Sequence, residues 1–297
     1  MKRSALHLLS ALLAALSLAG VTRAADNGPE AAAAPPQIDW EIGPKKVSIE
    51  NYAEIDLPAG YYYTGKKGTV KLMELMGNLL SGTESGFLAP GNIFEKGGDA
   101  TWFVVFEYSD AGYVSDAEKS KIDDEFRASM LARMKEGVKS ENEERKKRGF
   151  PTMEVTGWAV PPHYDESTHN LEWGLLLKSS SGSNTVNYQV RLLGRKGYMS
   201  SILVLGADEL EGSLPAFRKV LASYDFKEGQ RYAEYRQGDK IAKYGLIGLL
   251  GAGGLAVAAK TGLLKYVWKF LVFAIVAFGA FFKKIWDRFF GKKETVD

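Results

Sequence analysis

The C-terminal segment, residues 236–297, constrains this 297-residue chain most, because it contains two apolar runs. Residues 244–259 form a run of sixteen residues without a charge, and residues 270–282 form a second run after a lysine-bearing link. Apolar runs of this kind predict attachment to a membrane. We expect residues 236–297 to be a C-terminal helical membrane anchor, with a span over 244–259 and a second span or an interfacial helix over 263–290.

Lysine positions set the orientation of the first span. Lys260, Lys265 and Lys269 follow it directly, and the positive-inside rule places such residues in the cytoplasm. The chain before the span then lies outside the cytoplasm. A second crossing would carry the five basic residues of 283–293 outward, against the same rule. A membrane hairpin and a helix on the inner face therefore both stay open.

The N-terminus has the pattern of an export signal. Lys2 and Arg3 precede an apolar run rich in Leu and Ala, and small residues occupy the cleavage positions up to Ala24. The run is shorter than the ~20 residues that a spanning helix needs. We expect residues 1–24 to be a signal peptide, residues 25–37 a flexible linker and residues 38–235 an exported domain.

Charge and cysteine content exclude several classes of function. The whole chain carries a net charge of +2, but residues 1–24 hold +3 and residues 236–297 hold +7, which leaves −8 for residues 25–235. A domain that acidic does not suit nucleic acid, where neutralisation of phosphates supplies most of the affinity. The chain has no cysteine, so thiol catalysis, thiol redox chemistry and thiolate metal sites are excluded.

Hydrophobic periodicity predicts an α+β fold, an antiparallel sheet flanked by helices, between the signal peptide and the membrane anchor. Strands are expected where apolar residues alternate or run together between turn residues, and helices where they recur every three to four positions. The turn-rich links after residue 160 favour sequential antiparallel pairing. The expected strands are 47–49, 53–57, 101–108, 154–160, 171–178, 185–193 and 198–205, and the expected helices are 69–80, 115–149 and one that begins near Ser213.

The long helix is expected to begin at a capping box, Ser115 to Glu118, and to end at Gly149. Its last third is strongly charged, with pairs such as Glu141 and Arg145 four residues apart in the favourable order. We expect this part to be a solvated helix end rather than a basic binding patch.

Residues 60–67 match the phosphate-loop pattern GxxxxGK up to its last position. A phosphate loop needs Ser or Thr there to hold magnesium, and this chain has Lys67. Three consecutive tyrosines also crowd a loop whose backbone should surround phosphate. We expect an aromatic strand end followed by a glycine turn.

One stretch gathers residues that could carry chemistry. His163 and His169 lie six positions apart with Asp165 and Glu166 between them, and Glu172 follows. Imidazoles and carboxylates bind zinc or hold a water for general-base catalysis. The candidate metal ligands are His163, Asp165, Glu166 and His169. The spacing matches no known zinc motif, and the same residue types suit a polar turn. A polar turn, a metal site and a contact with a ligand or partner therefore stay open.

The stretches GFPTMEVTGWAVPPHYDESTHNLEWGLLL, NYQVRLLGRKGYMS and KIAKYGLIGLLGAGGLAVAAKTGLLK resemble a family of uncharacterised bacterial membrane-anchored proteins that is grouped as one domain of unknown function. The resemblance covers roughly residues 47–293 and implies a signal peptide, a periplasmic domain and a C-terminal anchor, but no activity. The closing stretch LPAFRKVLASYDFKEG is similar to the end of the PsbP/Mog1-like fold, which implies a binding or assembly module.

The residues and the resemblance together favour a protein of the bacterial inner membrane with its soluble domain in the periplasm. We expect a non-enzymatic module that binds a partner or helps to assemble the envelope. Two alternatives stay open: a metal-binding protein or hydrolase that acts through residues 163–172, and a ligand-binding subunit of a transport system. The expected partners are the membrane and an envelope protein, and neither a cofactor nor nucleic acid is expected.

Overall fold

The computed structural model describes residues 37–91 and 100–250. The predicted signal peptide, the predicted linker up to residue 36 and residues 251–297 of the predicted anchor lie outside the described residues. Within the described ranges, no helix is both long enough and apolar enough to cross a membrane.

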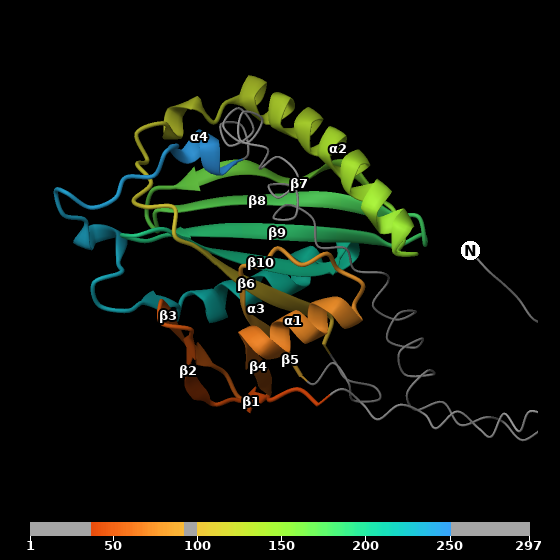
Figure 1. Cartoon of the computed structure of the whole chain (residues 1–297), viewed down its shortest axis with the longest axis horizontal. Helices are drawn as coiled ribbons and strands as arrows, with labels where there is room; N and C mark the ends of the chain where they lie inside the picture. The colour runs from red at the N-terminus through yellow and green to blue at the C-terminus, as the bar shows by residue number, and fades with distance from the viewer. Residues whose placement is uncertain (1–36, 92–99, 251–297) are drawn as a thin grey trace, which may run out of the picture.

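The described chain forms two antiparallel sheets (Figure 1). The larger has eight strands in the order β1-β4-β5-β6-β10-β9-β8-β7, and the smaller has the order β11-β3-β2. The strands are β1 (Glu41–Ile42), β2 (Lys45–Ile49), β3 (Ala53–Leu57), β4 (Tyr61–Gly65), β5 (Glu84–Pro90), β6 (Trp102–Ser109), β7 (Met153–Asp165), β8 (Asn170–Ser179), β9 (Asn184–Leu193), β10 (Tyr198–Gly206) and β11 (Asp225–Phe226). The antiparallel α+β fold and the sequential pairing of β7 to β10 are confirmed.

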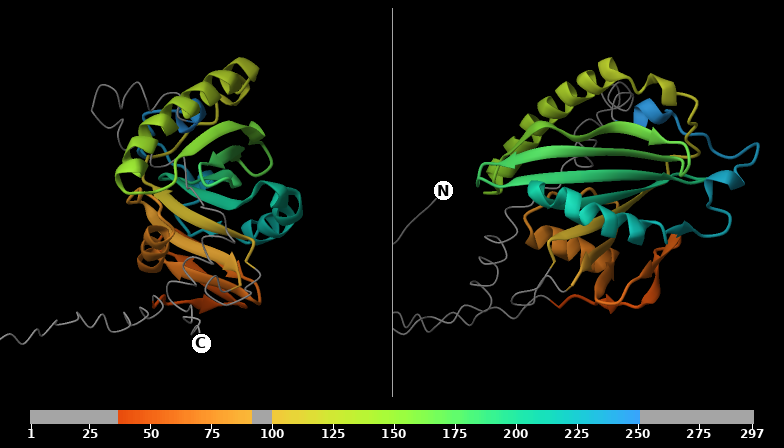
Figure 2. Two further views of the ribbon diagram at one scale, coloured as in Figure 1. Left: turned by 90° about the vertical axis from the view of Figure 1, so that its right-hand side faces the viewer. Right: turned by 180° about the vertical axis from the view of Figure 1, so that it is seen from behind.

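Helices cover both faces of the large sheet. The α-helices are α1 (Lys66–Leu75), α2 (Asp124–Lys147), α3 (Leu210–Leu221) and α4 (Leu246–Leu249). Figure 2 shows α1 and α2 on one side of the sheet and α3 on the other. Short 3-10 turns occupy Lys119–Lys121, Ala207–Glu209 and Tyr232–Glu234.

Strand β6 explains why the sheet needs cover on both faces. Its side chains Trp102, Val104 and Phe106 pack with the small sheet and α3. The alternate side chains Phe103 and Val105 pack with α1. Because both faces of the strand are buried, its sequence is continuously apolar rather than alternating.

The predicted start of the long helix was wrong. The N-cap is Asp123, whose carboxylate accepts a hydrogen bond from the backbone N–H of Phe126 over 2.8 Å. Ser115 lies in the irregular segment before the 3-10 turn. Both positions offer the oxygen that a helix start needs. The helix begins only after the 3-10 turn Lys119–Lys121 and after Ile122, which is already buried in the apolar cluster that α2 shares.

The end of α2 is also less solvated than predicted. Arg145 is buried and donates from its Nε to the carboxylate of Glu141 over 2.8 Å. Arg148 and Glu144 form the exposed pair that the spacing predicts, also at 2.8 Å. One ion pair of the predicted solvated end therefore belongs to the packed interface instead.

Two strands on the β1 side of the sheet differ from the predictions. Residues 84–90, where the sequence predicts no strand, form β5 between β4 and β6. The tyrosines of 61–63 lie in β4 as an aromatic strand, and helix α1 starts directly after it at Lys66. Pairing on both edges supplies the hydrogen bonds of β5 although glycine, proline and glutamate are rare in strands.

Residues 236–250, which the sequence assigns to the anchor, pack onto the domain. Arg195 holds Asp239 through two hydrogen bonds of 2.7 and 2.8 Å. Tyr113 pairs with Ile241 in a parallel bridge. Leu246 and Leu249 of α4 are buried among the apolar side chains beneath α2. The start of the apolar run 244–259 therefore touches the core of the domain.

Candidate functional site

The predicted metal residues lie on and beside the β7–β8 hairpin. Strand β7 extends to Asp165, five residues beyond the predicted end, and β8 begins at Asn170. His163 is thus a strand residue, opposite Glu172, while Glu166 and His169 belong to the turn. His169 has a φ of 53°, a left-handed conformation that non-glycine residues adopt mainly in tight turns.

The four predicted metal residues contact four different partners. His163 Nε2 lies 3.9 Å from a carboxylate oxygen of Glu172. Asp165 accepts hydrogen bonds from Ser167, and Glu166 pairs with Lys119 at 3.0 Å. His169 contacts the hydroxyl of Tyr164 at 3.0 Å.

Among the residues that the structure describes, no three His, Asp or Glu side chains are grouped closely enough to hold a metal ion. The metal site stays a prediction from the sequence.

A cleft of about 800 Å³ opens beside this hairpin. It is lined by the hairpin, by the end of β9, by the last turns of α3 and by residues 224–232, and it includes His163, Asp165 and Glu166 but not His169. The apolar part of the lining comes from Leu192, Leu221 and Phe226. Three tyrosines also line the cleft: Tyr164, Tyr224 and Tyr232. Three of the four predicted site residues therefore share one cavity with an amphipathic lining.

A buried carboxylate, Glu172, lies in the lining of the cleft. The residue is only 9% exposed. Its Oε2 accepts a short hydrogen bond from the hydroxyl of Tyr188. The guanidinium of Arg218 on α3 donates to the same hydroxyl over 3.3 Å and lies 3.6 Å from Oε2. Strands β8 and β9 and helix α3 thus meet at this carboxylate.

Burial keeps the hydroxyl of Tyr188 protonated. Loss of water, and after it the hydrogen bond to Glu172, raise the pKa of Tyr188 to about 12 although the neighbouring Arg218 lowers it. The tyrosine therefore stays a hydroxyl donor at neutral pH. On the rim of the cleft, the hydroxyl and backbone N–H of Ser167 lower the pKa of Asp165, so this carboxyl stays charged.

The orientation of His163 determines which nitrogen faces Glu172. Its Nδ1 lies 3.1 Å from the carbonyl oxygen of Pro161, which can only accept. Nδ1 therefore carries the proton in the neutral imidazole, and Nε2 presents a lone pair toward the carboxylate. Two acceptors face each other across 3.9 Å.

A set of stacked tyrosines adjoins the cleft. The ring of Tyr113 stacks on Tyr232 at a centroid distance of 4.6 Å and contacts Tyr235 at 4.2 Å. We call Tyr113, Tyr232 and Tyr235 the tyrosine stack. Tyr232 also lines the cleft, so the tyrosine stack and the cleft lie next to each other.

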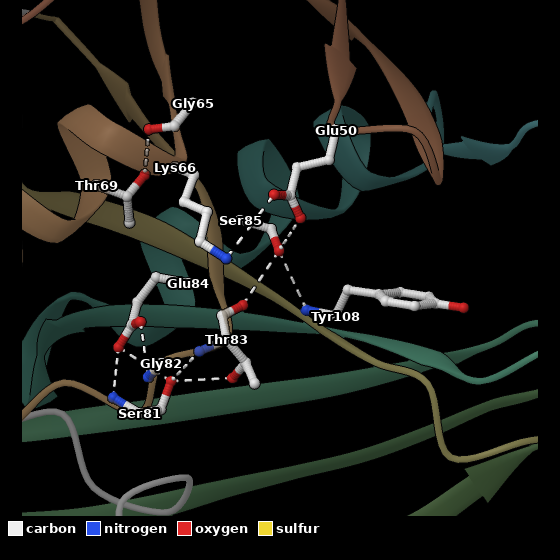
Figure 3. A network of polar contacts seen from close by, with 10 residues as sticks. All are labelled: Glu50, Gly65, Lys66, Thr69, Ser81, Gly82, Thr83, Glu84, Ser85 and Tyr108. Atoms are coloured by element: carbon white, nitrogen blue, oxygen red, sulfur yellow. Dashed lines mark hydrogen bonds and ion pairs between the residues drawn. The ribbon is translucent and has the colours of Figure 1, made fainter.

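A second group of buried carboxylates lies away from the cleft, between β5 and β6. Glu84 and Glu107 face each other in register, and the hydroxyl of Ser81 donates to Glu107 over 2.6 Å. Figure 3 shows Glu84 held by the backbone and hydroxyl of Ser81 and by the N–H of Gly82. Burial raises the pKa of Glu107 to about 7.

Sequence reasoning missed Tyr188 and Arg218. Tyr188 belongs to the alternating pattern of β9, which indicates only that one face is buried. Arg218 is one of two basic residues near the end of α3, where cations are common. Their meeting at Glu172 follows from the order of the strands and the position of α3, and no local signal in the sequence marks it.

Two solved structures are similar to this chain at low sequence identity. Cyanobacterial PsbP (CyanoP) from Synechocystis is 12% identical, with 69% of this chain and 98% of that chain covered and a TM-score of 0.36. The Ran-binding protein Mog1p of Saccharomyces cerevisiae is 8% identical, with 66% and 100% covered and a TM-score of 0.32. No curated protein matches the sequence. The family model described as a protein of unknown function, DUF2167, matches residues 41–282, and the chain belongs to this family.

Proposed function

We propose that this protein is a membrane-tethered protein of the bacterial envelope whose exported domain binds a partner protein. The tether is the apolar C-terminal segment, and the binding surface is the end of the domain that carries the tyrosine stack. The domain works in the periplasm, and the anchor holds it at the inner membrane.

The exposure of apolar side chains beside the tyrosine stack carries the proposal. Within the described residues, three large apolar side chains are exposed: Ile42, Tyr235 and Ile241. Tyr235 contacts the ring of Tyr113, and Ile241 pairs with the backbone of the same residue. Two of the three therefore adjoin Tyr113 of the tyrosine stack. Exposed apolar groups that gather in one place indicate an interaction surface, and tyrosine is enriched at the centres of such surfaces.

The rigidity of this surface also suits binding. The hydroxyl of Tyr232 donates to the backbone carbonyl of Val114 over 3.0 Å, which fixes one ring of the stack. Residues 236–242 are held on the domain by the bonds between Arg195 and Asp239. A surface that is ordered before binding loses less conformational entropy when the partner arrives.

A pull-down of the tagged full-length chain from detergent-solubilised envelopes tests the proposal. We expect wild type to capture a stoichiometric protein partner and Ile241→Ser to reduce the captured amount by about tenfold. Ile42→Ser is the matched control, because Ile42 and Ile241 are both 52% exposed but only Ile241 adjoins the tyrosine stack. Equal capture by the two variants, or no partner with wild type, would contradict the binding proposal.

The membrane tether is tested separately. We expect wild type to remain with the inner membrane after washing at high salt and to be released by detergent, because apolar burial is insensitive to salt. A chain that ends at residue 250 keeps the buried Leu246 and Leu249 but lacks the rest of the first apolar run and all of the second, and it should be released in soluble form. Release of wild type by salt alone would show that the chain is not anchored by its apolar segment.

A further inference from the structure

We propose that the cleft recognises a lysine or arginine side chain of the partner, and that its cationic group binds between His163 and Glu172. This inference rests on the proposed function, because it names the chemistry by which the partner would be recognised. The tyrosine stack would supply the apolar contact area, and the cleft would supply the selectivity for charge.

Two atoms of the cleft can accept hydrogen bonds from one ligand. With its proton on Nδ1, His163 presents the lone pair of Nε2, which lies 3.9 Å from Oε2 of Glu172. One N–H-bearing nitrogen can lie within ordinary hydrogen-bond distance, about 2.8–3.0 Å, of both atoms at that separation. An ammonium or guanidinium group provides several donors and a positive charge, so it suits a pair of acceptors of which one is anionic.

The second oxygen of Glu172 is open to the cleft. Oε2 contacts Tyr188 and Arg218. Oε1 accepts no hydrogen bond from the described residues, and it is not fully buried. Glu172 as a whole is more than nine-tenths buried and lines the cavity. A largely desolvated carboxylate with one available oxygen binds a cation more strongly than a carboxylate in water.

Arg218 does not saturate this carboxylate. Its nearest nitrogen is 3.6 Å from Oε2, beyond an ordinary hydrogen bond, and its side chain is 59% exposed. Its guanidinium donates to the Tyr188 hydroxyl instead. Arg218 thus makes no ordinary hydrogen bond to Glu172.

The remaining charges of the cleft favour a cation. Four carboxylates line it, Asp165, Glu166, Glu172 and Asp225, against the two guanidinium groups of Arg218 and Arg231. Arg231 is already neutralised, because it binds Asp225 with contacts of 2.7 and 3.1 Å. The lining is therefore net negative, in the same sense as the domain around it.

The apolar part of the lining suits the stem of a long cationic side chain. Leu192, Leu221 and Phe226 present aliphatic and aromatic carbon to the cavity, and the tyrosines add ring faces. Lysine and arginine bury their methylene groups along such surfaces while the charged end reaches a polar site. Aromatic rings near the cation add attraction.

Titration of the full-length chain in detergent micelles with capped amino acids tests the chemistry. The probes are N-acetyl-lysine methylamide and its uncharged counterpart N-acetyl-norleucine methylamide. We expect the lysine probe to shift the NMR signals of His163 and to bind at least about tenfold more tightly than the norleucine probe. Equal binding of the two probes would overturn the inference.

Substitutions locate the binding. Glu172→Gln keeps the shape of the side chain and should weaken the lysine probe by about tenfold, and His163→Asn, on a half-exposed residue, should weaken it by a smaller factor. Glu136→Gln changes the net charge equally on the remote exposed face of α2, where Glu136 pairs with Lys139, and should leave binding unchanged. Binding that survives Glu172→Gln in a chain with wild-type thermal stability would overturn the inference.

The two proposals fail in different ways. Loss of partner capture in Ile241→Ser but not in Glu172→Gln would leave the partner-binding function in place and remove the cationic contact. Binding of the lysine probe without any captured partner would leave the cationic contact in place and remove the partner-binding function. Loss of both activities in Glu172→Gln and of neither in Glu136→Gln is the result that we expect.

Discussion

Two carboxylates of the same sheet, Glu107 and Glu172, are both buried and both accept a hydrogen bond from a hydroxyl group, yet their surroundings differ. Glu107 lies on the central strand β6, is 2% exposed and has a carboxylate oxygen, Oε2, that accepts no hydrogen bond. Glu172 lies on β8, beside a cleft, with one oxygen open to it. One carboxylate is sealed in the fold and the other is available to a ligand.

The electrostatic consequences follow from this difference. Burial raises the pKa of Glu107 to about 7, although the hydrogen bond from Ser81 and the charge of Arg191 both lower it. Arg191 is itself buried, and its guanidinium lies between the rings of Trp173 and Tyr198 at 5.2 and 5.3 Å. Near the cleft, the corresponding arginine is the half-exposed Arg218. Position in the sheet, rather than residue type, decides which carboxylate can serve binding.

Removal of the two arginines should separate the two sites most strongly. We expect Arg191→Met to lower the free energy of unfolding by about 3–5 kcal/mol, because it removes a buried cation near a buried carboxylate and its contacts with two rings. Arg218→Met should cost less than about 1 kcal/mol, because solvent screens an exposed charge. Urea unfolding at pH 7 measures both values, and equal costs would remove the distinction between sealed and open sites.

The pH dependence of stability should distinguish the carboxylates next. The pKa of Glu107 is raised from 4.5 to about 7 in the folded state, so its contribution to stability is fully present below 4.5 and is lost as the pH rises through 7. Glu107→Gln cannot ionise. Relative to wild type, the variant should gain up to about 3 kcal/mol between pH 4.5 and 8. Urea unfolding over this range checks the gain, and a constant difference between the two proteins would contradict it.

The parts of the fold that sequence predicts are those with local causes. Residues 171–178, 185–193 and 198–205 alternate or run apolar between short polar turns, and each lies within an observed strand of the sheet. Residues 84–90 show no alternating or continuous apolar pattern. They form β5 because β4 and β6 pair with them on either side. Tertiary pairing overrode local preference there.

The candidate site was predictable only in part. Clustering drew attention to His163, Asp165 and Glu166, and all three line the cleft. The chemistry that joins them to Tyr188 and Arg218 depends on strand order and on helix packing, which bring together residues 30 positions apart. The left-handed backbone of His169, which turns that side chain toward Tyr164 and Asp116, is likewise invisible in the pattern of residue types.

Removal of single serine hydroxyl groups should have a smaller effect than removal of arginine. The hydroxyl of Ser81 lies within hydrogen-bond distance of both Glu84 and Glu107 in the sealed site, and its one hydrogen serves the shorter contact, to Glu107, so Ser81→Ala should lower the free energy of unfolding by about 2 kcal/mol. Ser167 donates to Asp165 over 2.6 Å on the exposed rim of the cleft. Water replaces that bond, and Ser167→Ala should cost less than about 0.5 kcal/mol. Thermal unfolding of the two variants measures this difference. Similar losses of stability in Ser81→Ala and Ser167→Ala would contradict the prediction.

The smallest effect on ligand binding is expected from Tyr188→Phe. The variant removes the hydroxyl that donates to Oε2 of Glu172, at a cost of about 1 kcal/mol, because Arg218 remains beside the carboxylate. Loss of that donor leaves Oε2 freer to accept from a cationic ligand. Binding of the lysine probe should therefore stay equal or tighten by about two- to threefold, opposite in sign to Glu172→Gln.

The pair of variants distinguishes a binding carboxylate from a structural one. Suppose that Glu172 served only to accept the hydrogen bond of Tyr188 inside the sheet. Tyr188→Phe and Glu172→Gln would then both weaken that hydrogen bond and lower stability, and they would not change the affinity for the lysine probe in opposite directions. Calorimetric titration beside thermal unfolding of each protein separates the two cases. A weaker affinity in Tyr188→Phe would mean that the hydroxyl orients Glu172 for the ligand, and that the open site depends on the packed sheet behind it as much as the sealed site does.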